Sequence, residues 1–141
     1  MNLEDVRSKI DVIQDNLDKL EILRKLSFEE FISDFRNIDS AQHRLQTSIQ
    51  ALLDIGGYII SSLGLKAPTS NAEIVEILVD GGLVSSEKLD SYIGMARFRN
   101  RIVHLYNDID LSLLYRILQD EFEDIKSFYK EFLEVIKTHS D

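Results

Sequence analysis

The stretch LEDVRSKIDVIQDNLDKL, residues 3–20, decides the fold class of this 141-residue chain. Its large apolar residues recur at alternating intervals of three and four positions, which places them along one side of an α-helix. They are Leu3, Val6, Ile10, Ile13, Leu17 and Leu20. Such a seam is buried only when a neighbouring helix covers it, so the stretch predicts a first helix of about twenty residues within a helical bundle.

The same helical period recurs along the rest of the chain. Ser27 and Glu30 form a capping box, which predicts a short helix. Longer helices are predicted at 39–63, at 71–80, from Ser85 or Ser86 through the segment 97–106, and from the N-cap Asp110 to about 137. No convincing strand is present. We therefore predict an all-α fold, a single domain over 1–141 built as an up-and-down bundle of four principal helices plus short helices, with no sheet.

The pair Gly56-Gly57 lies inside the second long predicted helix. Each glycine costs roughly 1 kcal/mol relative to alanine in a helix interior, so the pair needs a physical reason. No strand precedes it and no Lys-Ser or Lys-Thr follows it, which argues against a phosphate-binding loop. We expect a neighbouring helix to approach closely at this point.

The composition is that of a globular protein, with 44% hydrophobic and 29% charged residues. The absence of cysteine excludes disulfides and thiolate chemistry. No apolar run approaches the roughly 18 residues of a membrane-spanning helix. The N-terminus, Met1 to Asp5, is acidic, unlike the start of a secretory signal. We expect a cytoplasmic protein that makes no contact with membranes.

The formal net charge of −9 argues against broad binding to nucleic acid, but it leaves room for a focused phosphate site. Three of the eight arginines fall within five residues, in the stretch RFRNRIVHLY at 97–106, beside an amide, an imidazole and a phenol. The groups are Arg97, Arg99, Asn100, Arg101, His104 and Tyr106. Together they could clamp a phosphate and move a proton beside it. No set of His, Asp and Glu has the spacing of a metal site, and we predict none.

Unrolled as a helix, this segment carries two apolar stripes, so it should be sandwiched inside the bundle or between two subunits. The stripes are Leu89, Ile93, Ala96 and Val103, and Met95, Phe98, Ile102 and Leu105. Asn100 falls within the first stripe, and Tyr92 falls on a border between the two. Arg99 and His104 lie about 140° apart around an unbroken helix. They can share a site if the helix loosens near His104 or if two copies meet in a symmetric dimer, which the two-faced helix favours.

Each polar residue of the segment also has a purely structural interpretation. Asn100 and His104 could satisfy each other or a backbone carbonyl. Arg97 and Arg101 could form surface pairs with Asp or Glu, and Tyr106 could cover the core at the end of the helix.

The stretch MARFRNRIVHLYNDID at 95–110 resembles the Arg-x4-6-His motif of the HEPN superfamily, in the Arg-x4-His-x-Tyr form of its HepT-like branch. Three earlier segments look like those that precede the motif in this branch: LSFEEFISD at 26–34, HRLQTSIQALLDIGGYII at 43–60 and GLKAPTSNAEIVEIL at 64–78. The resemblance covers nearly the whole chain. A bare Arg-x4-His would be weak, whereas this extended string on an all-α background is specific.

The resemblance implies an RNA endonuclease that needs no metal or other cofactor and acts as the toxin of a toxin–antitoxin pair. Its partners would be a second copy, with both motifs in one cleft, and a minimal nucleotidyltransferase antitoxin. By position, catalysis falls on Arg99 and His104, with Asn100 in support. Tyr106 would accept AMP, which silences the nuclease. Independently of the resemblance, we expect Arg97 and Arg101 (surface pairs in the alternative interpretation) to contact the RNA backbone.

A non-catalytic protein could use the same groups. Recognition of a phosphate and chemistry at a phosphate need similar side chains, so the chain could bind a nucleotide or RNA without cleaving it, or serve as the interaction subunit of a nucleotidyltransferase pair. A purely structural adaptor would leave the arginine cluster unexplained. If the nuclease interpretation holds, the nucleophile is the 2′-hydroxyl of RNA, and DNA is not a substrate.

Overall fold

The computed structural model describes the backbone of residues 1–104 and 110–140, and the side chains of 1–100 and 110–140. Every regular element among these residues is helical, which confirms the predicted all-α fold. In chain order they are η1 (Leu3–Val6), α1 (Arg7–Arg24), α2 (Phe28–Ile32), α3 (Phe35–Ser62), α4 (Asn71–Asp80), η2 (Ser86–Lys88), α5 (Leu89–His104) and α6 (Leu111–Thr138).

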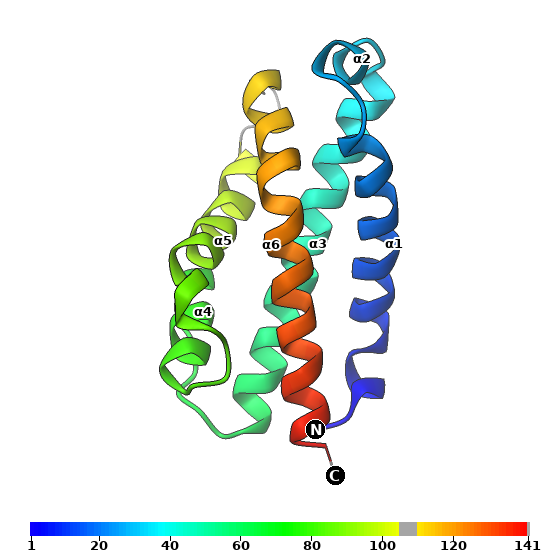
Figure 1. Cartoon of the computed structure of the whole chain (residues 1–141). Helices are drawn as coiled ribbons and strands as arrows, with labels where there is room; N and C mark the ends of the chain where they lie inside the picture. Colours follow the sequence, from blue (N-terminus) through cyan, green and yellow to red (C-terminus); the bar gives the residue numbers. More distant parts are fainter. Residues whose placement is uncertain (105–109, 141) are drawn as a thin grey trace.

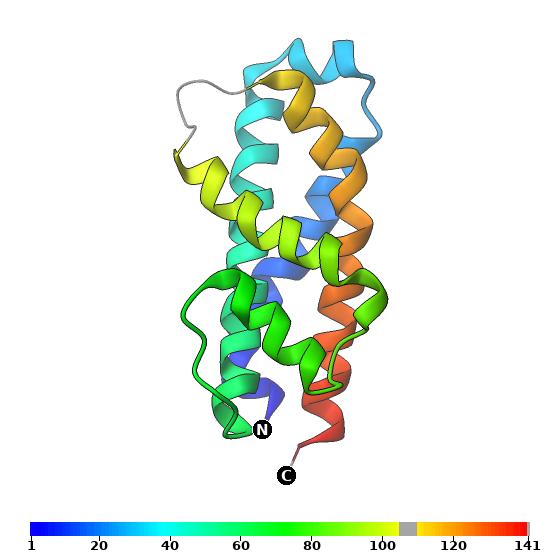
Figure 2. The same cartoon turned by 90° about the vertical axis from the view of Figure 1, so that its left-hand side faces the viewer.

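Three long helices, α1, α3 and α6, lie side by side and form the body of the bundle (Figure 1). Helix α5 crosses this body obliquely, and α4 lies beside it (Figure 2). Both α4 and α5 pack against α3 and against each other. The two chain termini lie at one end of the bundle, whereas α2 lies at the other (Figure 1). The last turn of α5 points toward the end that holds α2 (Figure 2).

The apolar seam of the first helix is buried as predicted. Val6, Ile10, Ile13 and Leu20 are buried, with Leu3 and Leu17 partly buried against them. Each fully buried aliphatic side chain contributes about 1.5–3 kcal/mol relative to an exposed one, so the seam holds α1 to the bundle. The helix is not uniform, however, because its first four residues form the 3₁₀ turn η1, which the side chain of Asn2 caps.

Helix α3 begins at Phe35, earlier than the predicted start at Asp39. Its N-cap is Asp34, whose carboxylate accepts hydrogen bonds from the backbone N–H of Arg36, at 2.9 Å, and from the Arg36 guanidinium. The first fully buried residue of the helix is Ala41, and before it only Ile38 packs in part against the core. Capping chemistry, rather than hydrophobic periodicity, therefore sets the true beginning of this helix.

Three other predicted helix boundaries agree closely with the structure. The capping box of Ser27 and Glu30 is formed, with both reciprocal hydrogen bonds present. Helix α4 covers the predicted range 71–80 and is followed by Gly82, which takes the left-handed φ of 71°. Asp110 caps α6 by accepting from the N–H of Leu113 at 3.2 Å.

Gly56 is the point at which α3 meets its neighbours most closely. A Cβ atom at this residue would lie 2.8 Å from Cγ2 of Ile74 on α4 and 3.3 Å from Cζ of Phe132 on α6. Beyond its own helical turn, none of the described residues comes within 4 Å of a Cβ built at Gly57. The predicted close approach therefore explains the first glycine of the pair but not the second.

This difference predicts opposite effects for two matched substitutions. Gly56→Ala should lower the free energy of unfolding by about 1–3 kcal/mol, because the added methyl overpacks the contact with α4. Gly57→Ala should raise it by about 0.5–1 kcal/mol, since only the conformational entropy of the unfolded chain changes. Denaturation in urea measures both. A Gly56→Ala protein as stable as Gly57→Ala would contradict the packing described for α3 and α4.

Candidate functional site

Helix α5 is held to the bundle by the row Tyr92, Met95 and Ala96, all of which are buried. The ring of Tyr92 stacks on Phe128 of α6, with 4.1 Å between centroids, and its hydroxyl donates to Glu131 at 2.7 Å. Burial of Tyr92 and this hydrogen bond raise its pKa well above the usual range, so the hydroxyl stays a donor. The start and middle of α5 are thereby fixed against α6.

The packed face of α5 differs from the prediction of two opposed apolar stripes. Tyr92, expected at a border, is the centre of the buried row, because its hydroxyl finds a partner and the whole ring can be buried. Ile93 and Phe98, one from each predicted stripe, are only partly buried and flank that row. Asn100, expected within an apolar stripe, is exposed in the single chain.

Arg99 continues the buried row toward the carboxyl end of α5 and is itself half-buried. Its Nη1 lies 3.5 Å from Oδ1 of Asn100, and its buried Nε has no hydrogen-bond partner among the residues that the structure describes. Among the described residues, no carboxylate pairs with this guanidinium. An unpaired buried N–H costs about 1–3 kcal/mol, and such groups need an explanation beyond folding.

A third polar residue comes to this place from α4. Nδ2 of Asn71, in the first turn of that helix, donates to Oδ1 of Asn100 at 3.2 Å. Asn71 is absent from the set predicted from the sequence. It lies 29 positions before Asn100, and only the packing of α4 on α5 brings the two together.

The other predicted site residues are placed as follows. Arg97 is exposed, and no carboxylate of the described part of the chain pairs with it. The backbone of α5 is helical through Arg101 and His104, whose side chains lie outside the described residues. Tyr106 lies wholly outside them. The structure thus brings Arg99 and Asn100 together at one place and adds Asn71.

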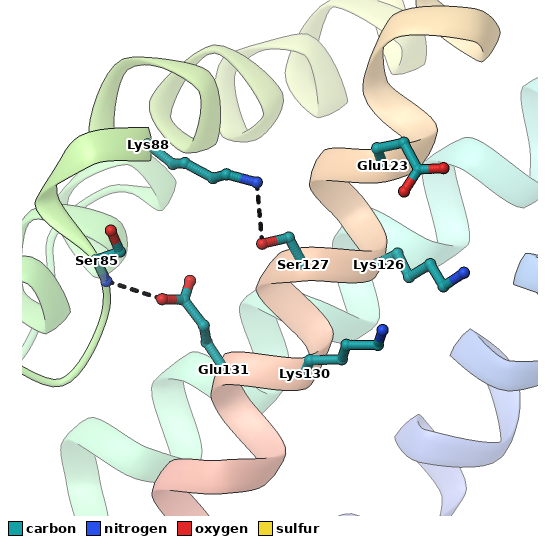
Figure 3. A pocket seen from close by; sticks show the side chains of 7 residues that line it. All are labelled: Ser85, Lys88, Glu123, Lys126, Ser127, Lys130 and Glu131. Carbon is teal, nitrogen blue, oxygen red and sulfur yellow. Dashed lines mark hydrogen bonds between the residues drawn. The ribbon is translucent and has the colours of Figure 1, made fainter.

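A separate hollow of about 430 Å³ lies between η2 and α6, near the start of α5 (Figure 3). Glu131 accepts there from the backbone N–H of Ser85 at 3.0 Å, and Lys88 donates to Ser127 at 3.1 Å. Lys126 extends from α6 in the direction away from Lys88 (Figure 3). The central polar groups of this hollow satisfy one another. They brace the start of α5 against α6, in contrast to the Nε of Arg99, which has no partner among the described residues.

Two further findings concern the part of the chain that the structure describes. Within it, no group of three or more His, Asp or Glu residues is placed to hold a metal ion. None of its helices is both long enough and apolar enough to cross a bilayer.

The family model for ribonuclease HepT-like proteins matches residues 13–132. The chain is 29% identical to the mRNA nuclease HepT of Shewanella oneidensis over 108 residues, 77% of this chain and 78% of that protein. It is 29% identical to the tRNA nuclease HepT of Aphanizomenon flos-aquae over 105 residues, 74% of this chain and 71% of that protein.

The fold agrees with a solved structure as well. The tri-AMPylated HEPN toxin of Shewanella oneidensis, solved in complex with an MNT antitoxin, superposes with a TM-score of 0.80 at 25% identity. The superposition covers 99% of this chain and all of that one. The resemblance seen in the motif therefore extends over the whole fold, and this chain belongs to the HepT-like ribonuclease family.

Proposed function

We propose that this protein is the toxin of a toxin–antitoxin pair, a metal-independent RNA endonuclease that acts as a homodimer and is silenced by AMP transfer to Tyr106. The observation that carries the proposal is the state of Arg99. Its guanidinium has a buried unpaired Nε, lacks a carboxylate partner among the described residues, and lies beside Asn100. A cation so placed is suited to bind a phosphate oxygen.

The proposed reaction uses only the substrate and the side chains of the motif. His104 removes the proton of a ribose 2′-hydroxyl, and the freed oxygen attacks the adjacent phosphorus. The bond to the 5′-oxygen breaks, and that oxygen takes up a proton. Arg99 stabilises the negative charge that builds on the non-bridging oxygens, with Asn100 in support. The products carry a 2′,3′-cyclic phosphate and a 5′-hydroxyl, and DNA is inert because it lacks the nucleophile. Arg97 and Arg101 contact the RNA backbone.

The geometry of α5 supports a cleft built by two copies. The helix continues without interruption through His104. Arg99 and His104 are five positions apart on this helix, so their Cα–Cβ directions differ by about 140°. An arginine from one protomer can face the histidine of its partner across a two-fold axis, where both motifs meet.

The regulatory part of the proposal rests on the solved relative, a HEPN toxin that is tri-AMPylated and bound to an MNT antitoxin. We expect this chain to gain the mass of one or more AMP groups when incubated with ATP and a cognate nucleotidyltransferase. Tyr106→Phe should gain none, because it lacks the accepting hydroxyl, whereas Tyr58→Phe should be modified like the wild type. Intact-protein mass spectrometry measures all three. A wild-type chain that gains no mass, or a Tyr106→Phe chain that does, would contradict the assignment.

The nuclease is tested directly with labelled RNA and purified protein in EDTA. Cleaved fragments are the expected result, since no step uses a metal ion. Retention of intact RNA would instead indicate a binding subunit without catalysis. If the protein neither cleaves nor binds the RNA, the proposal is refuted, and the role of a helical adaptor is what remains.

A further inference from the structure

The hydrogen bond between α4 and α5 can be assigned a donor and an acceptor. A guanidinium can only donate hydrogen bonds, so the Asn100 atom that faces Arg99 must be the carbonyl oxygen Oδ1. Asn71 contacts the same oxygen, and it must therefore do so through its amide nitrogen. One acceptor thus receives two donors, from different helices. Asn100 is exposed, and among the described residues none accepts a hydrogen bond from its Nδ2.

The residue that sets this direction belongs to a rigid element. Helix α4 is capped by Ser70, whose hydroxyl accepts from the N–H of Glu73 at 3.1 Å. A second hydrogen bond joins the hydroxyl of Thr69 to the Glu73 carboxylate at 2.7 Å. Ile74 is buried against Gly56 of α3. The backbone of Asn71 is therefore held in place at the start of α4, and its side-chain amide contacts Asn100 from there.

We propose that Asn71 is a positioning residue for the phosphate site, acting through Asn100; this rests on the proposed ribonuclease function. By holding Oδ1 of Asn100 toward α4 and Arg99, it turns the amide nitrogen outward. That nitrogen donates to a non-bridging phosphate oxygen beside the guanidinium. An amide turned the other way would present an acceptor to the anion and repel it.

Two substitutions of Asn71 separate this role from a contribution to folding. Asn71→Ala removes the donor, and kcat for RNA cleavage in EDTA should fall about tenfold with little change in KM, the effect of one lost hydrogen bond in the transition state. In Asn71→Asp, the new carboxylate can only accept hydrogen bonds. It should therefore turn the Asn100 amide round, so that Nδ2 faces α4, and lower kcat at least as much. A carboxylate in the first turn of α4 favours the helix, so Asn71→Asp should unfold at the same temperature as the wild type or higher.

A double-mutant cycle shows whether Asn71 acts through Asn100. If it does, Asn71→Ala/Asn100→Ala should be no slower than Asn100→Ala alone. Asn2→Asp is the matched control, because it makes the same change of charge at the start of another helix, η1. This helix lies at the end of the bundle that holds the chain termini, and the variant should cleave RNA like the wild type.

The outcomes distinguish the two proposals. A wild type that cleaves RNA while Asn71→Asp cleaves equally fast overturns this inference alone. Independent, multiplying losses from Asn71→Ala and Asn100→Ala also overturn it, because Asn71 would then act on its own. A wild type that cleaves no RNA overturns the proposed function and the inference with it.

Discussion

Replacement of His104 with alanine is expected to lower the rate of RNA cleavage by about 10²–10⁴-fold. The imidazole is the group proposed to remove the 2′-hydroxyl proton, and histidine is the side chain whose protonation changes near neutral pH. Alanine cannot take that proton. Since alanine favours helix, the helical content and the dimer should persist. Single-turnover cleavage assays, circular dichroism and gel filtration measure the three properties.

His43 provides the matched control for this variant. It is an exposed residue on α3, away from the motif helix in sequence, and His43→Ala should cleave RNA at the wild-type rate. If His104→Ala retained full activity, or if both histidine variants lost it equally, His104 would not be the catalytic base.

Replacement of Arg99 with methionine should reduce cleavage by about 10²–10³-fold while leaving stability unchanged or increased. The guanidinium buries an Nε that has no partner in the described part of the chain, whereas methionine fills a similar volume with no nitrogen or oxygen to satisfy. Loss of activity without loss of stability is the behaviour of a residue kept for function rather than for folding. Cleavage kinetics and urea denaturation give the two quantities.

Arg99→Lys offers a finer comparison. It keeps the charge but loses the planar pair of donors, so its rate should lie between those of the wild type and Arg99→Met. Arg7→Ala, at the opposite end of the bundle and paired with Glu4, serves as the control and should remain fully active. If Arg99→Met cleaves RNA at the wild-type rate, or loses activity only because it unfolds, Arg99 is not a catalytic residue.

The fold could be predicted well from the sequence where local chemistry decides it. A few neighbouring residues are enough to predict the apolar seam of α1, the capping box at Ser27 and the N-cap Asp110. The start of α3 differs from the prediction because none of residues 35–40 is fully buried; Ile38 is partly buried, and the cap Asp34 marks where the helix begins. Hydrophobic periodicity carries no signal for a solvated turn.

The candidate site was predictable only in part, for a different reason. Arg99 and Asn100 stand in one local motif, so the sequence placed them together. Asn71 belongs to another helix, and no spacing rule links it to α5. The burial of Tyr92 was likewise missed, since it depends on a partner for the hydroxyl, Glu131, that lies 39 positions away. Tertiary partners decide which polar side chains can be buried.

The end groups of the fragments made from RNA in the presence of EDTA test the central claim most directly. If the guanidinium of Arg99 and the imidazole of His104 drive attack by the 2′-hydroxyl, the upstream fragment will end in a 2′,3′-cyclic phosphate and the downstream fragment will begin with a 5′-hydroxyl. Fragments that end in a 3′-hydroxyl, or cleavage that appears only when Mg²⁺ is added, would contradict that mechanism.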